Sequence, residues 1–208
     1  LYQFAYRVDA AERYDRFLTQ YRADHSTLRK AVAEVCKLLI KDRVVDRTTL
    51  PPGGTASTAG TLVETYLRDR WQILNRTEQL MEPTSGVALR VWKHLDEKLP
   101  VGDDPGFLRK ALEPLLNTPY GLDYNQIALF FCAWYGIHRR SLEFQEKYMN
   151  NWAARDLTPH LALLDKPKIF IEKICLVVEG RIRRRDAEQE QQANLELLER
   201  IGKRTDYN

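Results

Sequence analysis

Residues 117–140 read NTPYGLDYNQIALFFCAWYGIHRR and contain the most strongly patterned helix of this chain. Asp123 and Gln126, three positions apart, form the pattern of a capping box, in which each side chain satisfies a free backbone amide of the first turn. Gly136 is expected to end the helix, because glycine readily takes the left-handed conformation that follows a helix. The apolar residues cover too much of the circumference for a surface helix or for a helix that lies in a DNA groove. We therefore expect a central helix that buries most of Ile127, Leu129, Phe130, Phe131 and Trp134.

Before this helix, the chain shows a series of amphipathic helices. Apolar residues recur at helical spacing in four stretches, 9–21, 26–41, 63–81 and 87–99. Two stretches rich in proline and glycine interrupt them, since these residues do not continue a helix. Residues 48–61 predict a flexible loop or linker, and residues 100–106 predict the boundary between a helical part and a mixed part.

After this boundary, helical and strand-like stretches alternate. A short helix is predicted at 107–116, and a second short helix at 158–165, where Thr158 has the place of an N-cap and Pro159 that of the first helical residue. Two stretches favour strands: 140–149, and 168–178 with its β-branched and aromatic residues. The fold class that follows is mainly α: a helical bundle in 1–99, a winged-helix-like α+β part in 107–180 and a C-terminal helix in 186–203.

Composition sets limits on the class of protein. Of the 208 residues 44% are apolar and 29% charged, which is ordinary for a globular chain and argues against disorder. The net charge of +3 is too small to indicate a nucleic-acid partner without local clustering. Three widely spaced cysteines, Cys36, Cys132 and Cys175, predict buried reduced thiols and a cytoplasmic location. No apolar run is long enough to span a membrane and no signal segment opens the chain. Its first residue is Leu, which suggests a fragment of a longer protein, or missing leading residues.

Recognisable catalytic motifs are missing. The glycine-rich stretch GGTASTAGT resembles a phosphate-binding loop, but Thr61 stands where such a loop needs lysine, so a flexible connector is the better interpretation. The four histidines have no partners at metal-ligand spacing, and no nucleophile motif is present. The sequence therefore predicts no cofactor, no metal and no activity for this chain alone. An active site assembled from distant residues stays open as an alternative.

Two arginine clusters are the strongest functional signal. They lie after the central helix and near the end of the second strand-like stretch, and they comprise Arg139, Arg140, Arg181, Arg183, Arg184 and Arg185. Guanidinium groups pair well with phosphate, so these residues are the predicted nucleic-acid contacts, with double-stranded DNA as the partner. The alternative is a solvated or protein-binding face on which Glu179, Asp186 and Glu188 neutralise the second cluster. Surface tryptophans could stack on bases, but Trp71, Trp92, Trp134 and Trp152 mostly occupy positions typical of a core.

A family resemblance adds a context. The stretches PYGLDYNQIALFFCAWYG and DLTPHLALLDKPKIF resemble a segment of the large P-loop ATPases of bacterial BREX-type phage-defence systems, over about residues 107–172. The resemblance implies a winged-helix-like region outside the ATPase core, and the nucleotide-binding motifs of that family are absent. It therefore implies a non-catalytic module of a larger defence protein that binds DNA, or another part of the same protein or complex. The alternative is a purely structural helical scaffold or a protein-interaction domain without nucleic-acid binding.

Overall fold

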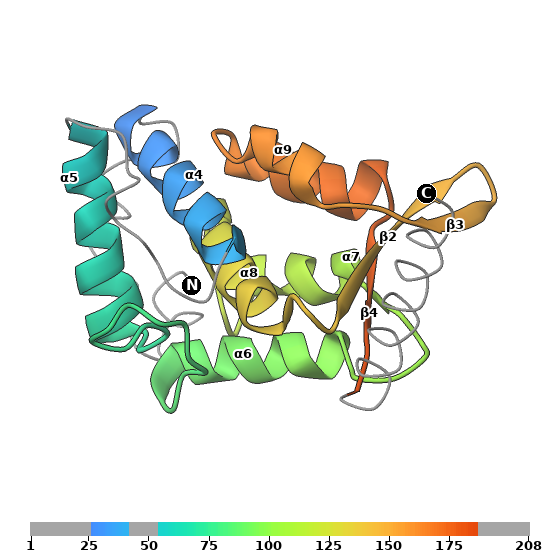
Figure 1. Ribbon diagram of the computed structural model, residues 1–208, viewed down its shortest axis with the longest axis horizontal. Helices are drawn as coiled ribbons and strands as arrows, with labels where there is room; N and C mark the ends of the chain where they lie inside the picture. The colour runs from blue at the N-terminus through green and yellow to red at the C-terminus, as the bar shows by residue number, and fades with distance from the viewer. Residues whose placement is uncertain (1–25, 42–53, 187–208) are drawn as a thin grey trace, which may run out of the picture.

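The computed structural model describes residues 26–41 and 54–186 (Figure 1). Its α-helices are α4 (Ser26–Lys41), α5 (Gly54–Thr61), α6 (Gly86–Lys98), α7 (Leu108–Leu112), α8 (Tyr124–His138) and α9 (Pro167–Glu172). The π-helices η2 (Leu62–Arg70) and η5 (Lys173–Val177) continue α5 and α9, and the 3-10 helix η3 (Glu113–Leu116) continues α7. A separate 3-10 helix, η4 (Thr158–Leu163), precedes α9. The strands are β1 (Gly106–Phe107), β2 (Leu142–Tyr148), β3 (Asn151–Ala154) and β4 (Arg181–Arg184). The prediction of a mainly α fold with a small α+β part is confirmed.

Helix α8 is the centre of the fold. It packs against α4, α6 and α9, and Figure 1 shows it running between them. Its side chains Ile127, Leu129, Phe130, Phe131 and Trp134 are completely buried, which confirms the predicted core helix. The capping box is also confirmed: Asp123 Oδ1 accepts from the Gln126 amide at 2.8 Å, and Gln126 Oε1 accepts from the Asp123 amide at 2.9 Å. Burial raises the pKa of Asp123, against the effect of its backbone hydrogen bonds.

The prediction that Gly136 ends this helix is wrong, because α8 continues to His138. The reason for glycine is a neighbouring backbone instead. A Cβ atom at this position would lie 2.0 Å from the carbonyl oxygen of Leu39 in α4 and 2.9 Å from a methyl group of Leu80. Gly136 therefore allows α4 to lie directly against α8, a requirement that comes from the tertiary structure.

Two predicted features before α6 are corrected. Residues 54–61 of the predicted loop form α5, and the rest of that loop, 48–53, lies outside the described residues. The helix predicted to reach residue 81 ends at Arg70, and the chain then turns so that Leu74 forms an isolated bridge with Leu80. Trp71 stacks on Phe130 of α8 with 4.2 Å between ring centroids, so burial of this side chain outweighs the local helical pattern.

The four strands form one antiparallel sheet in the order β1-β4-β2-β3. Strand β2 confirms the first predicted strand. The second is wrong: residues 168–178 form α9 and η5, and their apolar residues Phe170, Ile171, Ile174 and Cys175 are buried. A mostly apolar stretch of this length does not distinguish a strand from a buried helix. The strand lies later, at Arg181–Arg184, within the second arginine cluster. Helices α7 and α8, strand β2 and the short helix η4 follow the predicted order, whereas strands β1 and β3 were not predicted. Strand β4 pairs with β1 and β2.

A continuous cluster of buried apolar side chains links the regions before and after residues 100–106. All three cysteines are free and buried in it, as predicted.

At residues 158–163 the predicted short helix is the 3-10 helix η4, but the predicted cap is wrong: Asp156 accepts from the amide and hydroxyl of Thr158. The predicted helices at 9–21 and, beyond Asp186, at 186–203 lie outside the described residues. Within the described part of the chain, no helix has the length and apolar character needed to cross a membrane.

Candidate nucleic-acid interface

The arginines of β4 divide between the two faces of the sheet. Successive side chains of a strand point to opposite faces. Ile182 is buried opposite Phe144 of β2, and this pair defines the inner face. Arg184 shares the inner face, whereas Arg181 and Arg183 belong to the outer face together with Glu143 and Gln145 of β2, which lie opposite them in the register. The cluster that is continuous in sequence is therefore split by the pleat.

Arg184 is held inside the fold. Its guanidinium donates to Asp96 of α6 at 2.7 Å and lies 3.1 Å from Nδ1 of His138 in α8. Asp96 also accepts from Trp134 Nε1 at 3.0 Å, so one carboxylate joins α6, α8 and β4. Only 16% of the Arg184 side chain is exposed. This arginine has a structural partner and is poorly placed to meet a phosphate.

Arg181 is presented differently on the outer face. Its Nε donates to Gln145 Oε1 at 2.7 Å, and its guanidinium carbon lies 3.9 Å from the ring centroid of Trp152 in β3. Phe107 of β1 contacts the same indole edge-on, with 5.7 Å between centroids. Stacking on an aromatic ring fixes the guanidinium plane. Among the described residues, the partners of this guanidinium are Gln145 and Trp152 rather than a carboxylate. The expectation that Trp152 belongs to the core is wrong, because it is half-buried on this outer face.

Arg183 and Arg185 follow Arg181 along the outer face, towards and just beyond the end of β4. These three arginines form the outer row. Arg185 donates to Glu143 Oε2 at 2.6 Å, and Arg183 lies directly opposite Glu143 in the register. The Nε atom of Arg183 is buried and has no hydrogen-bond partner. Burial opposes the ionisation of Glu143, but hydrogen bonds from Gln145 and Arg185 outweigh it and hold the pKa of this carboxyl below its ordinary value.

Positive charge is in excess along this row. Arg181, Arg183 and Arg185 follow one another on one side of β4, whereas Glu143 is the carboxylate bound among them. Burial first, and then repulsion from the neighbouring charge of Arg183, lower the pKa of Arg181, whereas Glu143 acts against this shift. An anion placed against this row would relieve that repulsion.

Of the acids predicted to neutralise the second cluster, Glu179 has a different partner in the structure. Glu179 pairs with Lys147 of β2 at 2.8 Å, and Glu188 lies outside the described residues. The partners of Arg184 and Arg185 are Asp96 and Glu143, which are 88 and 42 residues away in sequence. No sequence pattern around the arginines indicates these two carboxylates.

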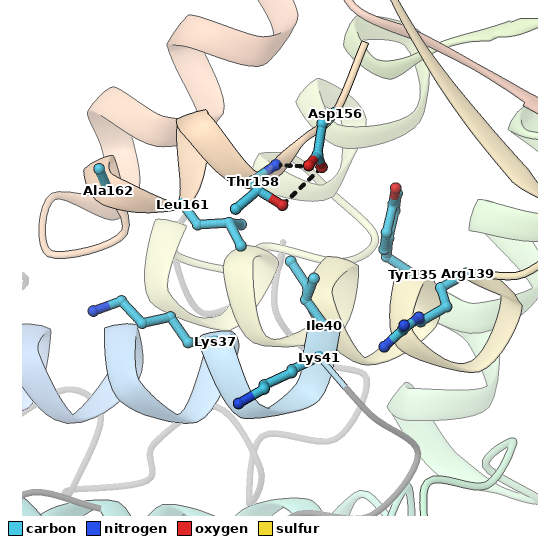
Figure 2. Close-up of a pocket in the computed structure, with 9 residues that line it drawn as sticks. All are labelled: Lys37, Ile40, Lys41, Tyr135, Arg139, Asp156, Thr158, Leu161 and Ala162. Carbon is cyan, nitrogen blue, oxygen red and sulfur yellow. Dashed lines mark hydrogen bonds between the residues drawn. The ribbon is translucent and has the colours of Figure 1, made fainter. Parts of the chain in front are cut away.

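The first arginine cluster meets the second through the backbone. Ser141 follows Arg140 directly, and its carbonyl oxygen accepts from the Arg185 amide at 2.8 Å, so Arg140 lies next to the end of the outer row. The side chains of Arg139 and Arg140 are both exposed. Arg139 lines a pocket between α4, α8 and η4 (Figure 2). The structure thus assigns the six predicted arginines to three different surroundings.

The remaining titratable clusters offer no clear chemistry. Across residues 26–41 and 54–186, no group of three or more His, Cys, Asp or Glu side chains is arranged to hold a metal ion. His94 is buried with Nε2 2.9 Å from the Ala111 carbonyl oxygen, and desolvation lowers its pKa. His160 is bonded to Glu146 beneath the ring of Phe144. These histidines connect structural elements to one another.

Comparisons of the chain with models of protein families, with curated proteins and with solved structures found no match.

Proposed function

We propose that this chain is a non-catalytic DNA-binding module of a larger bacterial defence protein. The observation that carries the proposal is the outer row of Arg181, Arg183 and Arg185, in which three guanidinium groups lie on one side of the sheet around the carboxylate of Glu143. Phosphate contacts of this kind supply most of the affinity of a protein for DNA whatever its sequence. The exposed Arg140 extends the row by one more cation.

The geometry supports contact with the DNA backbone rather than reading of bases by a helix. Helix α8, which has the place of a recognition helix in the winged-helix-like order, is buried along its length. Trp152 and Phe107 extend the outer row across β3 and β1 and give it an aromatic component. Aromatic and cationic groups on one surface bind single strands by stacking as well as by charge. Duplex and single-stranded DNA should therefore be compared directly.

The test replaces Arg181, Arg183 and Arg185 together by Gln and leaves Arg184 unchanged, because its loss would disturb Asp96 and the core. A matched control replaces three exposed cations elsewhere, Lys30, Arg76 and Lys93, by Gln, so that the change in net charge is the same. Fluorescence anisotropy with a short duplex and the corresponding single strand, over a series of salt concentrations, gives the affinities.

We expect the outer-row variant to lose salt-sensitive binding and to flatten the salt slope by about 2–3, since each phosphate contact contributes about 0.9. The control variant should retain most of the affinity of the parent chain. Equal losses in the two variants would show that only total charge matters. No binding by the parent chain at low salt would remove the DNA proposal.

A second candidate function is contact with another protein or another part of the same protein. Tyr148 and Met149, at the turn of the β2–β3 hairpin, are 65% and 78% exposed, and Val177 of η5 is 65% exposed. Exposed apolar side chains of this size are common at protein interfaces. We also propose a cytoplasmic location, supported by the three buried free thiols.

A further inference from the structure

A pocket of about 630 Å³ opens between the C-terminal ends of α4 and α8 and the segment that contains η4 (Figure 2). Lys37 and Lys41 come from α4, and Tyr135 and Arg139 come from the last turn of α8 and the residue after it. Figure 2 shows Arg139 reaching towards the end of α4, where Lys41 begins. The volume of the pocket lies within the ~300–1,000 Å³ typical of small-molecule sites.

The charges in this pocket are unbalanced. Lys37 pairs with Glu34 at 2.8 Å, outside the pocket lining. Lys41 and Arg139 have no ion-pair partner among the residues that the structure describes. The lining carboxylate, Asp156, is occupied by the amide and hydroxyl of Thr158, and these hydrogen bonds lower its pKa. Two exposed cations therefore remain available to an incoming anion.

Cations near helix C-termini also stabilise the helix dipole, and this would account for Lys41 and Arg139 taken separately. It does not account for the other walls. Tyr135 presents a phenol whose pKa is raised to about 12, first by burial and then by the charge of Asp156, so it stays a neutral hydrogen-bond donor. Ile40, Leu161 and Ala162 add an apolar wall. Cations, a hydroxyl donor and an apolar wall together have the composition of a ligand site.

We propose that this pocket binds a phosphate monoester, with the phosphate between Lys41 and Arg139 and the rest of the ligand against the apolar wall. Arginine suits this role because its planar fork forms two parallel hydrogen bonds to phosphate oxygens. The phosphate can belong to a free nucleotide or to the end of a nucleic-acid strand, since the chemistry is the same. The proposal is independent of DNA binding by the outer sheet face, because none of the pocket residues belongs to that row.

The test uses the whole chain and calorimetric titration with adenosine 5′-monophosphate, with adenosine as the ligand lacking phosphate. Arg139→Gln and Lys41→Gln remove the two available cations, and Arg76→Gln is the matched control, because it removes an exposed arginine that belongs neither to the pocket nor to the outer row. We expect each pocket variant to weaken nucleotide binding about tenfold or more, as for loss of a hydrogen bond to a charged group. The control should bind like the parent chain.

A second titration distinguishes the source of the phosphate. It compares a short oligonucleotide carrying a 5′-phosphate with the same strand ending in a 5′-hydroxyl. Tighter binding of the phosphorylated strand that Arg139→Gln abolishes would support the pocket and indicate strand ends as its ligands. Equal binding of nucleotide and nucleoside, no binding of either phosphorylated ligand, or an equal effect of Arg76→Gln would overturn the proposal. Unchanged melting temperatures of the three variants ensure that lost binding is not lost folding.

Discussion

The two faces of the small sheet use the same residue type in opposite ways. On the inner face Arg184 is nearly enclosed and is bound to Asp96, His138 and the ring of Trp134. On the outer face Arg183 lies one residue away, and its Nε has no partner. The comparison shows that a run of arginines in a strand is not one patch, since the pleat gives alternate residues separate environments. Only the outer residues remain available for a ligand.

Removing an aromatic ring from the inner face should have the largest effect. Phe144 is 2% exposed and packs close to Gly180. Phe144→Ala is expected to lower the free energy of unfolding by about 3–5 kcal/mol, because it leaves a cavity. Trp152→Ala on the outer face is the comparison, with an expected loss of about 1–2 kcal/mol from partial burial. Urea unfolding measures both, and a larger loss for Trp152→Ala would reverse the assignment of the faces.

Breaking the Arg184 network should have the next largest effect. Arg184→Gln removes the guanidinium from Asp96, which keeps its contacts with Trp134 and His138, and we expect a loss of about 2 kcal/mol in unfolding free energy. This is below the ~3–5 kcal/mol of a fully buried pair, because 35% of Asp96 is exposed. Arg185→Gln removes an arginine that is 34% exposed, against 16% for Arg184, and should cost less, about 1 kcal/mol. Equal losses for the two substitutions would contradict the distinction between the faces.

The pH dependence of stability should show that ionised Glu143 stabilises the fold through its ion pair with Arg185 on the outer face. Its folded-state pKa lies below the ordinary carboxyl value of about 4.3, so its ionised form stabilises the folded state above that pH. This contribution is lost as the pH falls through the folded-state pKa. We therefore expect Glu143→Gln to be less stable than the parent chain at pH 7 and equal to it near pH 3. A difference that persists unchanged in acid would mean that charge is not the cause.

The smallest effect on stability is expected for Arg183→Gln, within about 0.5 kcal/mol, because the side chain makes no hydrogen bond through its buried Nε. Although the fold stays intact, this variant should bind DNA more weakly. The slope of log affinity against log salt concentration should fall by about 0.9, the contribution of one phosphate contact. Anisotropy titrations and urea unfolding of the same sample measure the two quantities. A large loss of stability would place Arg183 with Arg184 as a structural residue.

Local sequence signals predicted the elements that depend on local physics. The capping box of Asp123 and Gln126, the amphipathic period of α4 and the apolar surface of α8 are set by nearest neighbours along the chain, and all three were predicted correctly. Three other interpretations failed because distant contacts decided them. The early end of η2 depends on the stacking of Trp71 on Phe130, and Gly136 is required by the Leu39 carbonyl of α4. The helical form of residues 167–177 depends on burial rather than on β-propensity.

The arginine cluster shows what the sequence determined and what required the tertiary structure. The sequence determines where the arginines lie along the chain, and alternation along a strand implies that neighbouring side chains separate onto two faces. The arginines concerned are Arg139, Arg140, Arg181, Arg183, Arg184 and Arg185. Which face is buried depends on the packing of Phe144 and Ile182, and the partner of Arg184 is 88 residues away. Lys41 and Arg139 likewise share a pocket only because α4 lies against α8 at Gly136. Charge is a property of each residue, but its availability to a ligand depends on which distant carboxylates and rings the fold brings to it.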